Sequence, residues 1–124
     1  MKIQQLLILI ILHLSISLPF LTAQTIPCEE LSKEISAEND VYGQISLDNS
    51  INAFNKLRLR ADSLNCSFEK STTLVILGSL YTDKGEYDLA LDNSRKGLQI
   101  RKKIHDTLKV ASVYNNLIHL ELSK

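Results

Sequence analysis

The stretch that decides the fold is Leu74–Ile104, LVILGSLYTDKGEYDLALDNSRKGLQIRKKI. Its first part places large apolar residues three or four positions apart, which is the period of one face of an α-helix. Gly85 then closes the short polar segment Asp83-Lys84-Gly85, and glycine readily adopts the positive φ that ends a helix. A second helical pattern follows over residues 86–104. The stretch therefore predicts two amphipathic helices joined by a tight turn.

Similar patterns flank this pair of helices on both sides. Leu31 and Ile35 lie four residues apart in a short segment that precedes a break at Glu38-Asn39-Asp40. Ser46 or Asp48 is suited to cap the helix that follows. We expect an all-α chain of about four to five antiparallel helices, over residues 29–37, 47–64, 68–82, 86–104 and 108–122.

The N-terminus is typical of a secretory signal peptide. Lys2 supplies the positive charge, residues 6–21 are mostly apolar, and Ala23 provides a small-residue exit. This divides the chain into a signal peptide at 1–23, a lead-in with a short helix at 24–45 and a helical region at 46–124. Pro19 is expected to end the signal helix, and residues 24–27 to form a flexible new N-terminus. The alternative is an uncleaved membrane anchor, although about 16 apolar residues are fewer than the ~20 that a spanning helix needs.

Export would place the chain in the periplasm or outside the cell, where paired cysteines oxidise. Cys28 and Cys66 are its two cysteines. A bridge between them would stabilise the fold by roughly 3–4 kcal/mol in the chain-entropy model, and the alternative is two separate, half-buried thiols. Because no further Cys or His stands at ligand spacing, we expect no metal site.

Composition and motifs argue against several functions. The formal net charge is +0, which gives no basic surface for nucleic acid. His105 and His119 have no third ligand or catalytic partner near them in sequence, and neither a nucleophile motif nor a phosphate-binding glycine loop is present. We expect a protein that is not an enzyme and that needs no cofactor.

The register of the central stretch resembles one tetratricopeptide repeat. The slots that carry the resemblance are Leu74, Leu77, Gly78, Tyr81, Gly85, Tyr87 and Ala90. The family places small residues where two helices cross closely and aromatic residues around that crossing. Ser94, Gly97 and Lys102 depart from it, because the family usually has an aromatic residue, an alanine and a proline there. The interval from Leu77 to Leu117 resembles that of the longer-spaced arrays of this family.

The resemblance implies a short solenoid that holds a protein or peptide in a groove, similar to exported arrays that precede bacterial sensor kinases and related signalling proteins. First helices of such repeats line the groove, which here implies Thr73, Ile76, Ser79, Thr82, Asn115, Asn116 and His119. The basic residues of the second helices, Arg101 among them, are expected on the solvated outer face. The alternative is a self-associating structural piece, a homodimer for example, or a truncated remnant without independent activity.

Overall fold

The structure, a computed structural model, describes the backbone of residues 2–122, and the side chains of that range apart from those of residues 12–26, 107–109, 111–112 and 115–116. Over the described backbone the regular structure is entirely helical. The helices are α1 (Lys2–Asp40), α2 (Leu47–Ser63), α3 (Ser67–Asp83), α4 (Tyr87–Lys103) and α5 (Thr107–Leu122). The expected all-α class is confirmed, and four of the five expected helices agree with the structure to within one residue at either end.

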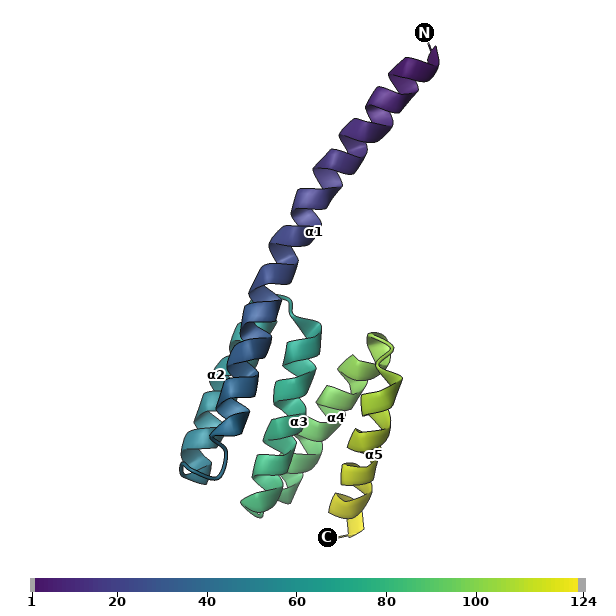
Figure 1. Cartoon of the computed structure of the whole chain (residues 1–124). Helices are drawn as coiled ribbons and strands as arrows, with labels where there is room; N and C mark the ends of the chain where they lie inside the picture. Colours follow the sequence, from purple (N-terminus) through teal and green to yellow (C-terminus); the bar gives the residue numbers. More distant parts are fainter. Residues whose placement is uncertain (1, 123–124) are drawn as a thin grey trace.

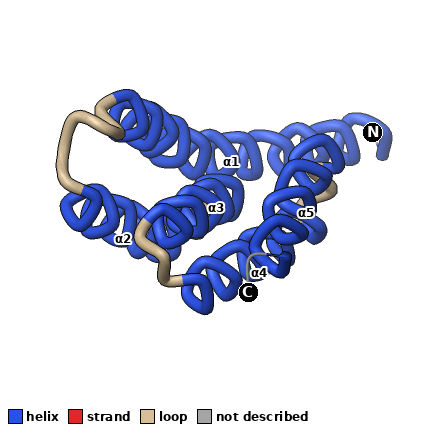
Figure 2. Tube along the Cα trace, turned by 90° about the horizontal axis from the view of Figure 1, so that it is seen from below, coloured by secondary structure: helices blue, strands red, loops and turns tan. Residues whose placement is uncertain are grey.

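Successive helices run in opposite directions and form two layers. Seen end-on, α1, α3 and α5 lie in one layer, and α2 and α4 lie in the other (Figure 2). The first half of α1 extends well beyond this bundle, and its second half packs beside α2 and α3 (Figure 1). One face of the bundle is therefore built from odd-numbered helices alone.

Helix α1 differs from the sequence-based expectation. It continues from Lys2 to Asp40 through Pro19 and Pro27, so the expected helix end at Pro19 and the expected helix start at residue 29 are wrong. The flexible N-terminus at residues 24–27 is expected of the cleaved chain and stays a prediction. A proline inside a helix removes one i→i−4 hydrogen bond and favours a kink. The helix nevertheless continues past both prolines. Among the described residues, no helix is both long enough and apolar enough to cross a membrane.

The turns between α2, α3, α4 and α5 are evenly spaced along the chain. Asn65, Gly85 and His105 each have a positive φ, between 56° and 79°. At each turn the next residue donates its N–H to a carbonyl five residues back, as Glu86 does to Tyr81. Each of these helices thus ends with a residue in the left-handed backbone conformation, as is common at helix C-termini. Helices α2, α3 and α4 also have the same length, so similar helices and turns recur at regular intervals over this part of the chain.

The core follows the predicted apolar faces. Leu31 and Ile35 of α1 are buried against α2 and α3, where Phe54 and Leu77 have no exposed surface. A second cluster joins Ala90 and Leu91 of α4 to Leu120 of α5. Tyr81 packs against both clusters and thereby connects the two halves of the bundle.

A disulfide links α1 to α3 within the first layer. Cys28 of α1 is bonded to Cys66, the residue that precedes α3, with the two Cα atoms 5.5 Å apart. Ser32, one turn further along α1, donates a hydrogen bond of 2.8 Å to the buried carboxylate of Glu69. The second half of α1 is thus joined to the start of α3 by a covalent bond and by a buried polar contact.

Candidate functional site

A cavity of about 220 Å³ opens between α3 and α5, on the side of the bundle formed by the odd-numbered helices. We call it the α3–α5 pocket, and its lining residues are Gly78, Ser79, Thr82, Asp83, Ser94, His119 and Leu120. Ser79, Asp83 and His119 are exposed at its rim, whereas Ser94 and Leu120 are buried. The pocket therefore has a buried floor and an accessible mouth.

Two small residues form the floor of the pocket. Gly78 of α3 faces Ser94 of α4 so closely that a Cβ atom on Gly78 would lie 2.2 Å from the Ser94 Oγ atom. Ser94 is 3% exposed. Since α3 and α4 touch here without large side chains between them, the space above their crossing remains unfilled up to α5.

The rim at the end of α3 is acidic. Asp83 accepts a hydrogen bond from the hydroxyl of Tyr42, which belongs to the loop after α1. This bond to Asp83 raises the pKa of Tyr42 above its usual value near 10. Lys84 lies 3.0 Å from a carboxylate oxygen of Asp48 and 3.0 Å from one of Glu86, and these hydrogen bonds raise the pKa of Lys84. The cation at this end of α3 is thus already shared by two carboxylates.

The structure brings together three of the residues expected to line a groove. Ser79, Thr82 and His119 line the α3–α5 pocket. Ile76 is half-buried and packs against the core of α1, α2 and α3. Thr73 is fully buried and donates its hydroxyl to the Lys70 carbonyl, so its assignment to an accessible groove is wrong. The side chains of Asn115 and Asn116 lie outside the described set.

The residues expected at the crossing of the central pair are mostly buried there. Leu74, Leu77, Gly78 and Ala90 are buried, and Tyr81 is half-buried, while Gly85 has a φ of +79° in the turn. Tyr87 is the exception, because it begins α4 and is 38% exposed. It therefore does not fill the space around the crossing as expected.

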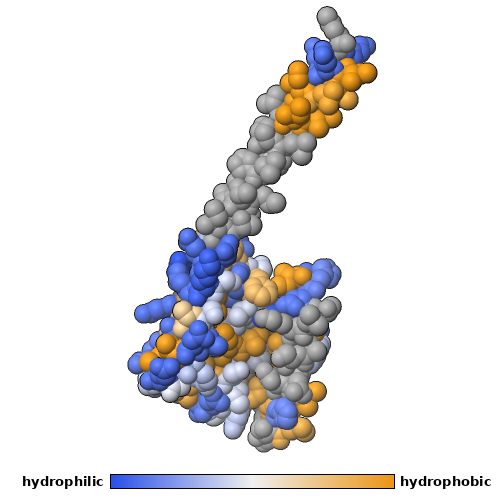
Figure 3. All heavy atoms as spheres, viewed as in Figure 1, coloured by the Kyte–Doolittle hydropathy of each residue, from blue (hydrophilic) through white to orange (hydrophobic). Residues whose placement is uncertain are grey.

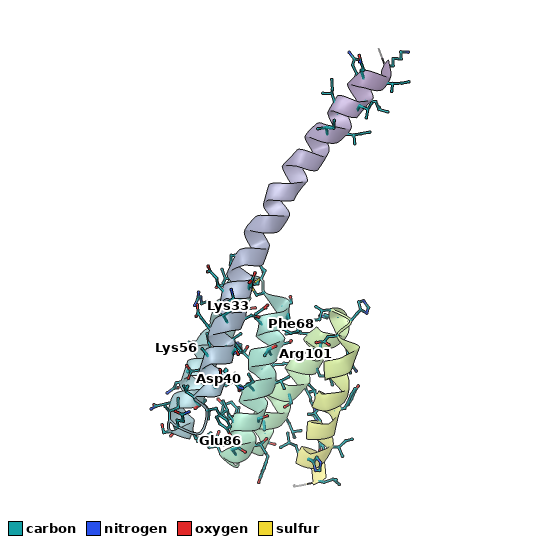
Figure 4. The ribbon with its side chains drawn as sticks, viewed as in Figure 1. Lys33, Asp40, Lys56, Phe68, Glu86 and Arg101 are labelled. Carbon is teal, nitrogen blue, oxygen red and sulfur yellow. A yellow bond between two sulfur atoms is a disulfide. The ribbon has the colours of Figure 1, made fainter. Side chains whose placement is uncertain are left out.

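Arg101 also differs from its expected place on a solvated face. It is 2% exposed, and its guanidinium lies over the Phe68 ring, 5.5 Å from the ring centroid. It donates to Asp106 at 2.8 Å and to Thr72 at 3.1 Å. Figure 4 shows Arg101 and Phe68 near one another at the end of the bundle away from Glu86. Arg101 thus joins α3, α4 and the turn before α5, and is structural.

Sequence reasoning misses four members of the pocket, and it expects Gly78 only at the crossing of the two central helices. The pattern marks Asp83 only as part of a turn, and Leu120 only as an apolar residue of the last helix. Ser94 carries a usable signal, because a small residue stands where the resembling family has an aromatic one. The absence of a large side chain between two helices predicts an unfilled space there. Ser94 is therefore the residue from which the pocket could have been located in the sequence.

One group of described residues has metal-ligand geometry. A ligand atom from each of Cys28, Cys66 and Glu69 lies within 4.8 Å of the other two. Both sulfur atoms belong to the disulfide, and a thiolate, rather than a disulfide sulfur, is the ligand that zinc binds. In its oxidised state this group therefore stabilises the fold and offers one carboxylate.

Comparison of the chain with protein-family models, with curated proteins and with solved structures finds no match.

Proposed function

We propose that this protein is an exported binding module, a short tetratricopeptide-like solenoid that holds a segment of another protein or a peptide on the face formed by α1, α3 and α5. The observation that carries the proposal is the α3–α5 pocket, with its buried floor and exposed rim, on that face. Ligand sites are typically concave, with a few polar groups that orient the ligand. The protein would act by binding and would perform no chemistry of its own.

The regular spacing of the turns supports the solenoid part of this proposal. Positive-φ residues recur at 65, 85 and 105, and α2, α3 and α4 have equal lengths. A chain that stacks similar two-helix units builds an extended face on one side, which such proteins use for partners. The small residues Gly78 and Ala90, at the contact between α3 and α4, agree with the repeat register, whereas Ser94 departs from it.

Export is supported by the first half of α1. Its apolar side chains from Leu6 to Ile11 are exposed, and Figure 3 shows apolar residues gathered toward the far end of this helix. An apolar segment that extends beyond the fold to which it is attached is typical of a targeting sequence. The Cys28–Cys66 disulfide also favours an oxidising compartment.

The test is selection of peptides from a random library with the full chain expressed for export. Each selected peptide is then measured by calorimetry against two variants. Ser79→Trp places a large side chain on the pocket rim, and Gln99→Trp places the same side chain on an exposed position of α4, in the other layer. We expect Ser79→Trp to weaken binding about tenfold or more, because an occupied pocket excludes the ligand.

Gln99→Trp should leave the affinity within about twofold, since surface changes away from a contact have small effects. Equal losses in both variants would place the binding elsewhere on the molecule. A library that yields no binder would contradict the function itself.

A second candidate is self-association through the outer surface of α5. Tyr114, Ile118 and Leu122 recur every four residues and are exposed, between 43% and 80%. Beside them Glu121 forms an ion pair with Arg95 at 2.6 Å. Light scattering over a range of concentrations tests this candidate. A dimer that dissociates in the Ile118→Glu variant supports it, and a monomer at every concentration removes it.

A further inference from the structure

We propose that the α3–α5 pocket binds one cationic side chain, a lysine or an arginine, of the partner peptide. This inference rests on the proposed function and specifies the chemistry of its ligand. Four observations carry it: the size of the pocket, the charge of its lining, the helix ends that meet beside it, and the arrangement of its buried and exposed walls.

The size of the pocket suits a single side chain. Its volume of about 220 Å³ lies below the roughly 300–1,000 Å³ that small-molecule and cofactor sites occupy. The mouth lies between exposed Ser79 and exposed His119, on different helices of the same layer. A peptide that crosses this layer can therefore insert one residue toward the floor at Ser94.

The lining favours a hydrogen-bond donor. Ser79, Thr82 and Ser94 contribute hydroxyl groups, and Asp83 contributes a carboxylate. Tyr42 donates its hydroxyl to Asp83 and so holds this carboxylate at the rim. An apolar side chain would displace water from these groups without replacing the hydrogen bonds, which is costly. An acidic side chain would be repelled by Asp83.

The ends of two helices add to this preference. Thr82 and Asp83 belong to the last turn of α3, and His119 and Leu120 belong to the last turn of α5. The two helices run in the same direction, so both C-termini lie at the same end of the bundle (Figure 1). The macrodipole makes each C-terminus partly negative and favours a cation within the final turn.

The neighbouring lysine does not neutralise Asp83. Lys84 lies between Asp48 and Glu86, at 3.0 Å from each, so its charge is engaged by two other carboxylates. Leu120 offers an apolar wall below the rim, and long basic side chains bury their methylene groups on such a surface while the charged head stays polar. Arginine and lysine satisfy both requirements together.

The experiment is a double-mutant cycle on a peptide selected from the random library. The full chain expressed for export is compared with its Asp83→Asn variant, and the peptide's basic residue is replaced by citrulline if it is arginine, or by norleucine if it is lysine. We expect selected peptides to share one basic position. In the parent protein its replacement should weaken binding about fivefold to tenfold, as for a partly exposed charge-assisted contact.

In Asp83→Asn the same replacement should weaken binding by no more than about twofold, because coupled groups lose their interaction only once. The matched control is Glu30→Gln. It removes one exposed acid that is close in sequence to Lys33. Figure 4 places Lys33 at the end of the bundle away from Glu86. The control should keep the full effect of the peptide replacement.

The outcomes separate this inference from the proposed function. Two outcomes would overturn the cation-binding inference and leave the proposed peptide-binding function standing. One is a set of selected peptides without a shared basic residue. The other is an equal effect of replacing the basic residue in the parent protein and in Asp83→Asn. A library that yields no binder at all would overturn both.

Discussion

Substitution of Gly78 by alanine tests the close contact beneath the pocket. A Cβ atom at this position would lie 2.2 Å from the Ser94 Oγ, 3.3 Å from the Ala90 carbonyl oxygen and 3.4 Å from the Ser94 Cβ. The first contact is far inside van der Waals distance and the other two are only tight. The clash therefore depends almost entirely on one hydroxyl group, which a second substitution can remove.

The expected free energies follow from two opposing effects. Replacement of glycine by alanine in a helix interior gains about 1 kcal/mol of propensity. Overpacking of a tight contact typically costs about 1–3 kcal/mol, here because the Ser94 hydroxyl must leave its rotamer or α4 must move. We expect Gly78→Ala alone to destabilise by about 1 kcal/mol, taking roughly 2 kcal/mol for the clash. In the Ser94→Ala background it should be neutral or stabilise by up to about 1 kcal/mol.

The assay is urea unfolding of the disulfide-bonded protein, followed by far-ultraviolet circular dichroism, for the parent, both single variants and the double variant. The coupling energy should be about 1–2 kcal/mol. Gly97→Ala is the matched control, because its Cβ would lie 2.9 Å from Val75 Cγ2 and 3.2 Å from the Ser71 carbonyl oxygen, neither of which Ser94→Ala changes. An equal effect of Gly78→Ala with and without the Ser94 hydroxyl would refute the proposed contact.

Three further predictions concern the two ends of the bundle. Reduction of the Cys28–Cys66 bond should lower the free energy of unfolding by about 4 kcal/mol, seen as a lower urea midpoint with dithiothreitol. Arg101→Ala should destabilise by about 3 kcal/mol in the same assay, because it removes the buried guanidinium that pairs with half-buried Asp106 and leaves a cavity. The Tyr42 pKa should fall toward its ordinary value in Asp83→Asn, as read from ring resonances during an NMR titration. The raised Tyr42 pKa means that the bond to Asp83 adds stability at neutral pH, and that this stability is lost as the pH rises past 10.

Local patterns are sufficient to predict most of the fold. The bounds of α2 to α5 agree closely with the prediction because the apolar period, Ser46 as a cap and Gly85 as a helix end are properties of neighbouring residues. The same patterns do not predict positive φ at Asn65 and His105, although these residues stand at equal intervals on either side of Gly85. Non-glycine residues seldom adopt positive φ, and asparagine and histidine are among those that do. The position of each turn is therefore visible in the sequence, but the residue that closes it is predicted only at Gly85.

The site is less predictable because its members come together through packing. Thr73 and Ser79 lie on the same helix and are similarly polar, yet one is fully buried and the other is exposed. Arg101 follows a solvated sequence pattern, but its neighbours Phe68 and Asp106 come from other elements and make burial favourable. The helical period gives the direction in which each side chain points from the helix axis. The packing of the neighbouring helices decides whether that direction is buried or exposed to solvent.

The pocket and the disulfide together explain how a small bundle can keep an open site. A pocket lined by Gly78 and Ser94 lacks the large side chains that would otherwise fill the space between α3 and α5, and missing contacts reduce stability. A disulfide acts mainly by restricting the unfolded chain, so its contribution is not confined to the residues that it joins. The bond at the start of α3 can therefore offset contacts that are lost near the other end of the same helix.

This explanation predicts that the two contributions are independent. Ser94→Phe, which introduces the aromatic residue that the resembling family has there, should fill the floor of the pocket beside Leu120 and leave Ser79 and Asp83 at the rim exposed to water. It should raise the free energy of unfolding by about 1–2 kcal/mol through the apolar area that it buries. The gain should be the same with and without dithiothreitol, because effects at distant sites add. A gain that appears only in the reduced protein, measured by urea unfolding, would show instead that the bond and the pocket act on the same part of the fold.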